Sequence, residues 1–570
     1  MADNDNIKEI FDEINKNLSS RNFVSAEANL NKILEVDPNN IKALFLLGSI
    51  FLEIKEFDRS KKILKKVIDL DPNIANANSN LGVVYINLRE FDFAKKYILK
   101  AIEINPKHLD AYNYLGLIYS ELGQFEKALS STKKALELNE SYFQGYNNLG
   151  LIYKKFNFFT EAEVNFKRAI TINSKFTQSY YNLMELYEKS NENKKLENII
   201  RDFEKIFNKN SISTLYEGHI LYKKEFFLDV IENLKSFIIK NDNKLEIDRV
   251  NLLAKSYDKI DDIENAFLHF EKTNILNLKS INKEIDKNNF LIKINNRINV
   301  FKKIKDDNSL VAETNYDYKP VFMIGFPRSG TTLLDTILRS HQMIEVIEEK
   351  HMMEKLINSL NRLTNNSIEK IYNIDDQHVK QLGENYFKEL HSYSKNFDTS
   401  KVYIDKLPFN IIYIAEIIRV FPNAKFIISI RHPCDCVLSC YMQNFNLNDS
   451  MSNFLNLNDA ANIYNVVMNL LKIYKKNFVF NFKEIKYENI ISNFNFEIKN
   501  VLDFLDLPWD DKVIEYQKTA ISRERIFTPS YDQVIKPLYS QSIARWEKYK
   551  NKLSKVYPIL EPWIKEFNYE

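Results

Sequence analysis

The hydrophobic and polar positions of this chain follow two different patterns that meet near residue 320. Before that point apolar residues recur at helical spacing, and the same few residue types return every 34 positions. After it, short apolar runs such as VFMIG and KFIISI alternate with helical stretches. Short apolar strands alternating with helices are typical of a parallel sheet covered by helices. The pattern therefore predicts an all-α solenoid in the first half and an α/β domain in the second.

The 34-residue repeat is carried by a small position, an aromatic position and two alanine positions. The small position is Gly48, Gly82, Gly116 and Gly150, and the aromatic position is Tyr85, Tyr119, Tyr153 and Tyr187. The first alanine position is Ala94, Ala128 and Ala162, and the second is Ala101, Ala135 and Ala169. Small residues let the two helices of a hairpin approach closely, and stacked hairpins form a solenoid. We expect clear units over residues 7–210 and a degenerate unit further on, where the spacing persists between residues 254 and 270.

The repeat resembles the tetratricopeptide repeat, whose solenoids usually act as binding surfaces. Asn80, Asn148 and Asn182 take the same position, two residues before the small one. They resemble the asparagine ladder of the solenoid in O-linked N-acetylglucosamine transferases. That resemblance implies hydrogen bonds to the backbone of an extended acceptor protein or peptide. Chance register in an asparagine-rich sequence is the alternative.

The stretch VFMIGFPRSGTTLLDTILRSH, residues 321–341, joins a strand to a helix through a Gly-x-x-x-x-Gly turn. It is close to a P-loop, but Thr331 stands where the lysine belongs, and the basic residue is Arg328. Such a turn aims backbone N–H groups and a helix N-terminus at one point, where an anion is stabilised. The hydroxyl groups of Thr331 and Thr332 and the guanidinium group of Arg328 add further donors. The missing lysine argues against a conventional nucleotide triphosphatase.

A second strand-to-helix turn follows in AKFIISIRHPCDCVLSC. It places Arg431 at the end of a strand and Ser439 in the next helix. Between the two turns, VYIDKLPFN places Lys406 at a third strand end. The carboxyl ends of parallel strands meet at one edge of the sheet, so we expect two adjacent anion sites there. One ligand with anionic groups at both ends explains such a pair.

These motifs resemble those of sulfotransferases that use 3′-phosphoadenosine-5′-phosphosulfate. GFPRSGTT resembles the 5′-phosphosulfate loop of that family, and RHPCDCVLS resembles its 3′-phosphate motif. Within the family, PRSGTTL, FPNAKF and DQVIKP are similar to tyrosylprotein sulfotransferases. The resemblance covers residues 320–550 and implies a fold related to nucleotide kinases, with no Walker-type metal site. RHPCDC departs from the RDxR sequence of the tyrosylprotein enzymes, so protein tyrosine, carbohydrate and small-molecule or lipid hydroxyls all remain open as acceptors.

The resemblance also implies roles for individual residues. It makes Glu349 the general base, with Glu348 as the alternative, and it makes Arg328, Lys406 and Ser530 the groups that stabilise charge during transfer. The donor-binding residues that it implies are Arg328, Ser329, Gly330, Thr331, Thr332, Arg431, Ser439, Tyr487 and Lys536.

Composition limits the remaining possibilities. The 79 Lys and Arg residues nearly balance the 77 Asp and Glu residues, so nucleic acid is not an expected partner and any anion site is local. No apolar run reaches the ~18 residues of a membrane span, and the N-terminus lacks the apolar core of a signal peptide. Three cysteines, Cys434, Cys436 and Cys440, match no structural zinc spacing and suggest a reducing compartment. We expect a cytoplasmic, metal-free protein.

The hypothesis from sequence is a tetratricopeptide solenoid over residues 7–277, a helical linker over 278–319 and a sulfotransferase domain over 320–570. The solenoid binds an acceptor or a partner, and the second domain transfers a sulfuryl group to a hydroxyl. One alternative is a P-loop phosphotransferase using ATP, disfavoured by Thr331 and by the pair of Arg431 and Ser439. The other is a non-catalytic scaffold with an inactive nucleotide-binding domain.

Overall fold

The structure is a computed structural model that describes residues 2–240, 242–281, 285–304, 316, 318–394, 397–522 and 543–569, with the side chains of residues 2–8 left aside. The chain forms two compact units, Met1–Ile220 and Leu221–Glu570. Among the described residues, the first contains helices alone, and the second contains a parallel sheet with helices. The predicted fold class, an all-α repeat region followed by an α/β domain, is confirmed.

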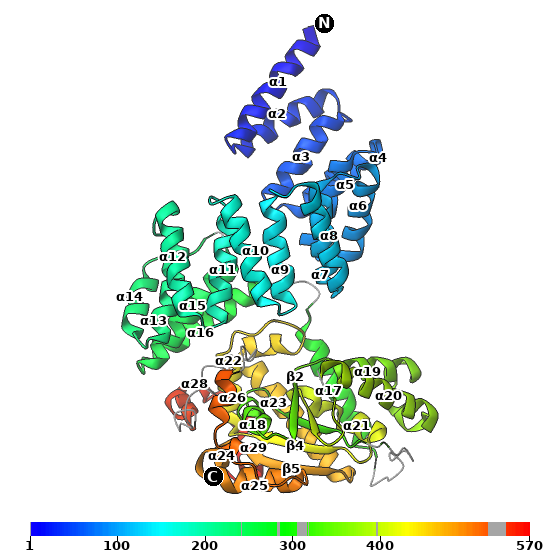
Figure 1. The fold of residues 1–570 in the computed structure, drawn as a ribbon, viewed down its shortest axis with the longest axis vertical. Helices are drawn as coiled ribbons and strands as arrows, with labels where there is room; N and C mark the ends of the chain where they lie inside the picture. Colours follow the sequence, from blue (N-terminus) through cyan, green and yellow to red (C-terminus); the bar gives the residue numbers. More distant parts are fainter. Residues whose placement is uncertain are drawn as a thin grey trace. The chain divides into compact units, whose positions relative to one another are not determined.

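Unit 1 is a row of helical hairpins (Figure 1, blue through cyan to green). Its helices are α1 (Ala2–Ser19), α2 (Phe23–Val36), α3 (Ile41–Glu53), α4 (Phe57–Leu70), α5 (Ala75–Asn87), α6 (Phe91–Ile104), α7 (Leu109–Glu121), α8 (Phe125–Leu138), α9 (Phe143–Lys155), α10 (Phe159–Ile172), α11 (Thr177–Lys189), α12 (Asn193–Phe207) and α13 (Ser211–Lys223), the last of which crosses the boundary.

The repeated small residues lie where the two helices of each hairpin meet. A Cβ atom at Gly82 would lie 2.6 Å from the side chain of Ile98, and one at Gly150 would lie 2.6 Å from the ring of Phe166. Close packing of this kind leaves no room for a larger side chain. The repeating glycine therefore sets the distance between the helices of each hairpin.

Unit 2 begins with helices and continues into the sheet. The helices before the sheet are α14 (Phe227–Lys235), α15 (Asn243–Lys259), α16 (Ile263–Ser280) and α17 (Lys287–Phe301). The strands are β1 (Val321–Gly325), β2 (Ile344–Glu348), β3 (Val402–Lys406), β4 (Lys425–Ile430) and β5 (Asn481–Lys486). The other helices are α18 (Thr331–Arg339), α19 (Met352–Leu363), η2 (Ile368–Asn373), α20 (Asp376–Tyr393), η3 (Pro408–Tyr413), α21 (Ile414–Val420), α22 (Pro433–Tyr441), η4 (Met451–Leu455), α23 (Leu457–Asn477), α24 (Tyr487–Ser492), α25 (Phe494–Phe504), η5 (Asp511–Val513), α26 (Tyr516–Ser522), η7 (Arg545–Tyr549), α28 (Lys550–Leu553) and α29 (Tyr557–Glu566).

The described strands pair in parallel in the order β2-β3-β1-β4-β5. Alternate residues of β1 serve opposite faces: Phe322 and Ile324 belong to one apolar cluster, and Val321 and Met323 belong to another. A sheet buried on both faces reads as continuous apolar runs, which is why β1 and β4 stand out in the sequence. The strand β3 was also assigned there, although it ends in Asp405 and Lys406. The more polar β2 and β5 were not assigned there.

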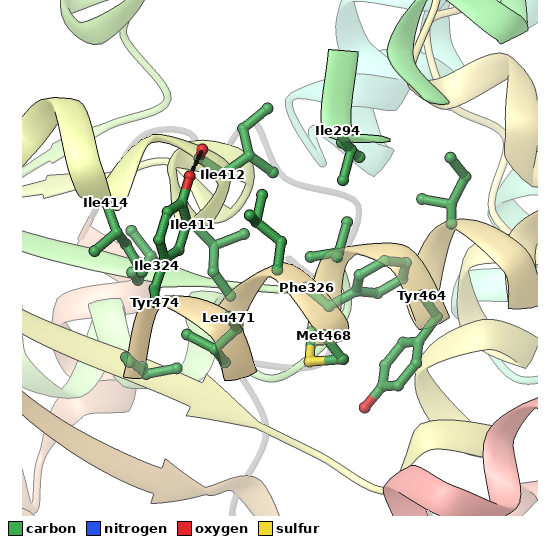
Figure 2. Packing of buried hydrophobic residues seen from close by; sticks show 14 of the residues in the cluster. Ile294, Ile324, Phe326, Ile411, Ile412, Ile414, Tyr464, Met468, Leu471 and Tyr474 are labelled. Atoms are coloured by element: carbon green, nitrogen blue, oxygen red, sulfur yellow. Dashed lines mark hydrogen bonds between the residues drawn. The ribbon is translucent and has the colours of Figure 1, made fainter. Parts of the chain in front are cut away.

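The helix α23 anchors one face of the sheet (Figure 2). Its Tyr474 donates a hydrogen bond to the carbonyl oxygen of Ile412 in η3 at 2.8 Å. Its Tyr464 packs against Phe326, the first residue after β1, with ring centroids 4.8 Å apart. The polypeptide that leaves β1 is thereby held by the core before it turns toward the predicted anion site.

The helices α15, α16 and α17 share this core with the sheet. Phe270 of α16 and Phe301 of α17 are buried in the same apolar cluster as Phe322. Arg297 of α17 is buried beside Glu416 of α21, with Nη2 2.5 Å from Oε1. The sequence pattern placed residues up to 277 in the solenoid and 278–319 in a linker, whereas packing groups 221–570 together.

A carboxyl group, that of Asp405, lies fully buried on β3. Its Oδ2 accepts a hydrogen bond from the hydroxyl of Tyr386 at 2.9 Å. Burial raises the pKa of Asp405 to about 7, and the hydrogen bond from Tyr386 partly offsets that rise. The folded protein therefore favours the neutral acid at this position.

This pKa predicts a dependence of stability on pH. The folded pKa lies above the unfolded value of about 3.9, so the contribution of Asp405 is complete below pH 4 and is lost as the pH rises to 7. Asp405→Asn keeps an acceptor for Tyr386 and does not titrate. Between about pH 5 and pH 7 the wild-type protein should lose about 2–3 kcal/mol more unfolding free energy than the variant. Urea unfolding of both proteins at the two pH values measures this difference, and parallel losses would contradict it.

Candidate active site

The predicted anion loop, residues 326–330, follows β1 at the carboxyl edge of the sheet. Arg328 and Gly330 both have positive φ angles, of 68° and 101°. A positive φ costs a residue with a side chain on the order of 1–3 kcal/mol, and such strain concentrates at functional sites. A Cβ atom at Gly330 would also lie 2.6 Å from the ring of Tyr487. Glycine is therefore required at position 330 both by the backbone angle and by the space.

The helix α18 begins directly after this loop, and its N-cap residue, Gly330, has no side chain that could cap the first N–H groups. The first N–H groups of a helix have no acceptor within the helix, and the helix dipole makes this end positive. Thr331 and Thr332 form the first turn, and both are buried. An anionic group suits this position.

Ser329, which was also predicted to bind the donor, is buried and lines a small internal cavity. Its side chain lines a cavity of about 10 Å³ beneath the loop together with Ser429. Its hydroxyl has no hydrogen-bond partner among the described residues. This cavity is about the volume that one water molecule needs.

The second predicted anion site meets the first. Arg328 Nε donates a hydrogen bond to Ser439 Oγ at 3.0 Å. Arg431 Nη1 donates to the carbonyl oxygen of Arg328 at 3.2 Å, and its guanidinium lies 4.9 Å from the ring centroid of Tyr487. The structure therefore brings together Arg328, Arg431, Ser439 and Tyr487, which lie far apart in the sequence. Two guanidinium groups next to a helix N-terminus form a strongly anion-selective edge.

His432 and the three cysteines that follow Arg431 are held in neutral forms. Burial, with the nearby charge of Arg431, lowers the pKa of His432 to about 4, and its Nδ1 accepts the N–H of Cys434 at 3.3 Å. Burial raises the pKa of the Cys434 thiol to about 12. The thiols of Cys436 and Cys440 donate to the carbonyl oxygens of Arg431 and Pro327. As protonated thiols, these cysteines pack in the interior and hold the segments at Pro327 and Arg431 in place.

Lys406 lies at the end of β3 and is completely buried. Its Nζ is 3.0 Å from Glu348 Oε1 and 3.0 Å from Glu349 Oε1. Burial by itself lowers the pKa of Lys406, but the charges of Glu348, Glu349 and Asp335 outweigh it and raise the pKa above its ordinary value. Lys406 is thus a protonated ammonium group inside the domain, with a carboxylate oxygen of each glutamate 3.0 Å from its Nζ.

The two glutamates differ in exposure. Glu348 ends β2 opposite Lys406 in the sheet register, and 10% of its side chain is exposed. Glu349 has a positive φ of 49° and a side chain that is 43% exposed. Its backbone N–H donates to the carbonyl oxygen of Lys406 at 2.8 Å, which fixes the turn. Glu349 is therefore the glutamate of this pair that can more readily meet a solvent-borne group.

Asp335 is a member of this cluster that sequence reasoning missed. It lies fully buried on α18, with Oδ2 3.9 Å from Lys406 Nζ, and it pairs with Arg339 at 2.8 Å. It links the helix of the anion loop to the buried lysine. The available signal was an acidic residue within the mostly apolar stretch LLDTIL.

Not every predicted site residue can be placed in this way. Ser530 and Lys536 lie outside the described residues. In unit 1, Asn80 is half-buried and donates to Ser49 Oγ at 3.0 Å, and Asn148 is half-buried and accepts from Asn147 Nδ2 at 3.4 Å. Asn182 is buried, and its Nδ2 donates to Asn147 Oδ1 at 2.8 Å. The three asparagines share a repeat position but not an environment.

Within the described part of the chain, no group of three or more His, Cys, Asp or Glu side chains is arranged to hold a metal ion. No described helix combines the length and the apolar character that a bilayer crossing needs.

Comparison with known proteins gives matches to both halves. Residues 320–511 match the Sulfotransferase family. Residues 17–79, 73–141 and 143–176 match tetratricopeptide repeat families. These matches confirm the resemblances seen in the sequence, to tetratricopeptide repeats in the first half and to sulfotransferases in the second.

The individual relatives share less than a third of their aligned residues with this chain. An uncharacterized protein of Aquifex aeolicus (strain VF5) is 29% identical over 323 residues, which are 55% of this chain and 41% of that protein. Protein-tyrosine sulfotransferase A of Caenorhabditis elegans is 27% identical over 239 residues, 40% of this chain and 60% of that one. Human protein-tyrosine sulfotransferase 1 is 24% identical over 244 residues, 40% of this chain and 64% of that one. The chain thus spans about half the length of the curated relatives that it matches.

Among solved structures, MamA is 29% identical, with coverage of 29% of this chain and 96% of that chain and a TM-score of 0.26.

Proposed function

We propose that the second half of the chain transfers a sulfuryl group from 3′-phosphoadenosine-5′-phosphosulfate to a hydroxyl group of an acceptor. The observation that carries this proposal is the contact between the two anion-binding strand ends, where Arg328 meets both Ser439 and Arg431. A donor with a phosphosulfate at one end and a 3′-phosphate at the other suits two adjoining anion sites. The match to the Sulfotransferase family supports the same conclusion.

The proposed chemistry uses the groups around Lys406. Glu349 removes the proton from the acceptor hydroxyl while the acceptor oxygen forms its bond to sulfur. The bond between sulfur and the 5′-phosphate oxygen breaks, and its electron pair leaves with adenosine 3′,5′-bisphosphate. Lys406 and Arg328 offset the negative charge that develops on the transferring group and on the leaving phosphate.

For the acceptor we propose a hydroxyl of a protein, with tyrosine as the first candidate, held in part by the repeat solenoid. Support comes from the curated relatives, which include protein-tyrosine sulfotransferases, and from the general use of repeat solenoids as binding surfaces. In the solenoid, Asn80 and Asn148 are half-buried and so retain surface for an acceptor backbone. Asn182 has its amide engaged by Asn147 and is the weakest of the three for this role.

Donor binding should depend on Arg431 through the 3′-phosphate. Arg431→Ala should weaken binding of adenosine 3′,5′-bisphosphate by ~2 kcal/mol, as expected for a lost charge-assisted contact, with little change for adenosine 5′-monophosphate. Calorimetric titration of both ligands, and of ATP, measures this. Arg362→Ala, which removes the same charge from an exposed position of α19, is the control. Equal losses for the two ligands would remove Arg431 from this role, and preferential binding of ATP would favour a phosphotransferase.

Catalysis should depend on Glu349 more than on Glu348. Glu349→Gln should lower turnover by about 10²–10⁴-fold, the usual contribution of a general base. Glu348→Gln is a matched comparison because each variant removes one carboxylate partner of Lys406 at the same distance. The difference between the two turnover numbers therefore reports proton transfer rather than the loss of an ion pair. A larger effect of Glu348→Gln would move the base to that residue.

Acceptor binding should depend on the solenoid asparagines. A double variant with Asn80→Ala and Asn148→Ala loses two possible backbone contacts, so the Michaelis constant for the acceptor should rise about tenfold. The dissociation constant for adenosine 3′,5′-bisphosphate should stay level. Asn182→Ala, which breaks a buried hydrogen bond, should instead lower the melting temperature of the solenoid. Labelled donor with a tyrosine peptide library serves as the assay, and an unchanged Michaelis constant would rule out the asparagine clamp.

A further inference from the structure

The hairpin α15–α16 contacts the far end of α22, the helix that follows Arg431 and carries Ser439. Asn274 Nδ2 of α16 donates a hydrogen bond to the carbonyl oxygen of Tyr441, the last residue of α22, at 3.0 Å. The ring of Phe267 stacks on the ring of Tyr441, with centroids 5.4 Å apart and 25° between the planes. The C-terminal end of α22 is therefore fixed directly by α16.

The N-terminal end of α22 is fixed by the segment Ile543–Tyr549. Asp435, in the first turn of α22, accepts the N–H of Ala544 at 3.0 Å on Oδ2 and the N–H of Trp546 at 2.9 Å on Oδ1. The ring of Trp546 stacks on His432, with centroids 4.9 Å apart and 7° between the planes. Both carboxylate oxygens of Asp435 are thus used to hold this segment.

Asp258 of α15 holds the same segment from its other side. Its Oδ2 lies 2.8 Å from Arg545 Nη2, and its Oδ1 accepts the hydroxyl of Tyr549 at 2.7 Å. The side chains of Asp258 and Arg545 are only 16% and 27% exposed, and Tyr549 is buried. A charge-assisted contact that is largely shielded from water is worth more than an exposed one.

A continuous chain of polar contacts therefore leads from α15 to the arginine of the second anion site. Asp258 binds Arg545, the backbone on either side of Arg545 binds Asp435, and Asp435 Oδ2 lies 4.0 Å from Arg431 Nη2. We propose that Asp258 is a positioning residue for the donor: through Arg545 and Asp435 it fixes α22 and Arg431 for binding a 3′-phosphate. This inference rests on the proposed function. It assigns to the degenerate repeat hairpin a part in donor binding, in addition to any part that the solenoid has in acceptor binding.

The test is calorimetric titration of the full chain with adenosine 3′,5′-bisphosphate and with adenosine 5′-monophosphate. Asp258→Asn, which removes the charge and keeps the size, should weaken bisphosphate binding about fivefold or more, while the monophosphate changes by less than about twofold. Asp261→Asn is the matched control because Asp261 pairs with Lys548 of the same segment, but with both side chains more than half exposed. It should leave both affinities unchanged. If the role of Asp258 were merely structural, Asp258→Asn would weaken the binding of both ligands to the same extent.

Three further variants keep the result decisive. Arg545→Gln should weaken bisphosphate binding as Asp258→Asn does, and the double variant should be no weaker than the single ones, because the two residues act through one contact. If Asp258→Asn unfolds, Tyr549→Phe removes only one hydroxyl and should give a smaller loss with the same ligand preference. If the wild-type chain prefers the bisphosphate and these variants bind it equally well, only the positioning role of Asp258 is overturned. A wild-type chain that does not prefer the bisphosphate would overturn the proposed function, and this inference with it.

Discussion

The buried ammonium group of Lys406 is the interaction on which the candidate site depends. A charge without solvent is tolerated only with opposite charges around it, and Lys406 has Glu348 and Glu349 at 3.0 Å and Asp335 at 3.9 Å. These carboxylates come from β2, from the turn after it and from α18. The lysine therefore joins the end of β3 to the neighbouring strand and to the helix of the anion loop. Moving any of these elements would remove at least one of the charges that balance the buried ammonium group.

The anion loop, residues 326–330, lies next to this cluster and has a strained backbone that needs contacts from several elements. Arg328 has a positive φ, and the energetic cost of that conformation is offset by its hydrogen bond to Ser439 and by the contact from Arg431 to its carbonyl oxygen. Tyr487 closes over Gly330 from the end of β5. Three strand ends thus stabilise one turn, and the guanidinium groups of Arg328 and Arg431 converge at the proposed anion site.

The second unit extends beyond the sheet because specific polar residues bind the preceding helices to it. Arg297 of α17 meets Glu416, and Asn274 of α16 meets the end of α22. Buried polar pairs of this kind fix one relative arrangement of the helices, since any other would leave them unsatisfied. The helices α15–α17 are therefore as much a part of the second unit as its own crossover helices, although the sequence pattern of α15 and α16 continues that of the repeats.

The sequence alone was sufficient for what depends on local pattern. The 34-residue period follows from the close approach of two helices at each glycine, and the apolar strands β1 and β4 are readable because both of their faces are buried. The motifs around Arg328 and Arg431 carry recognisable anion-binding chemistry for the same local reason. Only the tertiary structure showed that Lys406 is buried, that Asp335 faces it, and that Asn182 is engaged within the solenoid. Only it showed that Asp258 and Asp435 hold one segment between them. Each of these facts depends on which residues meet across long stretches of chain. Periodicity specifies the face on which a residue lies, and the packing of other elements decides what it meets there.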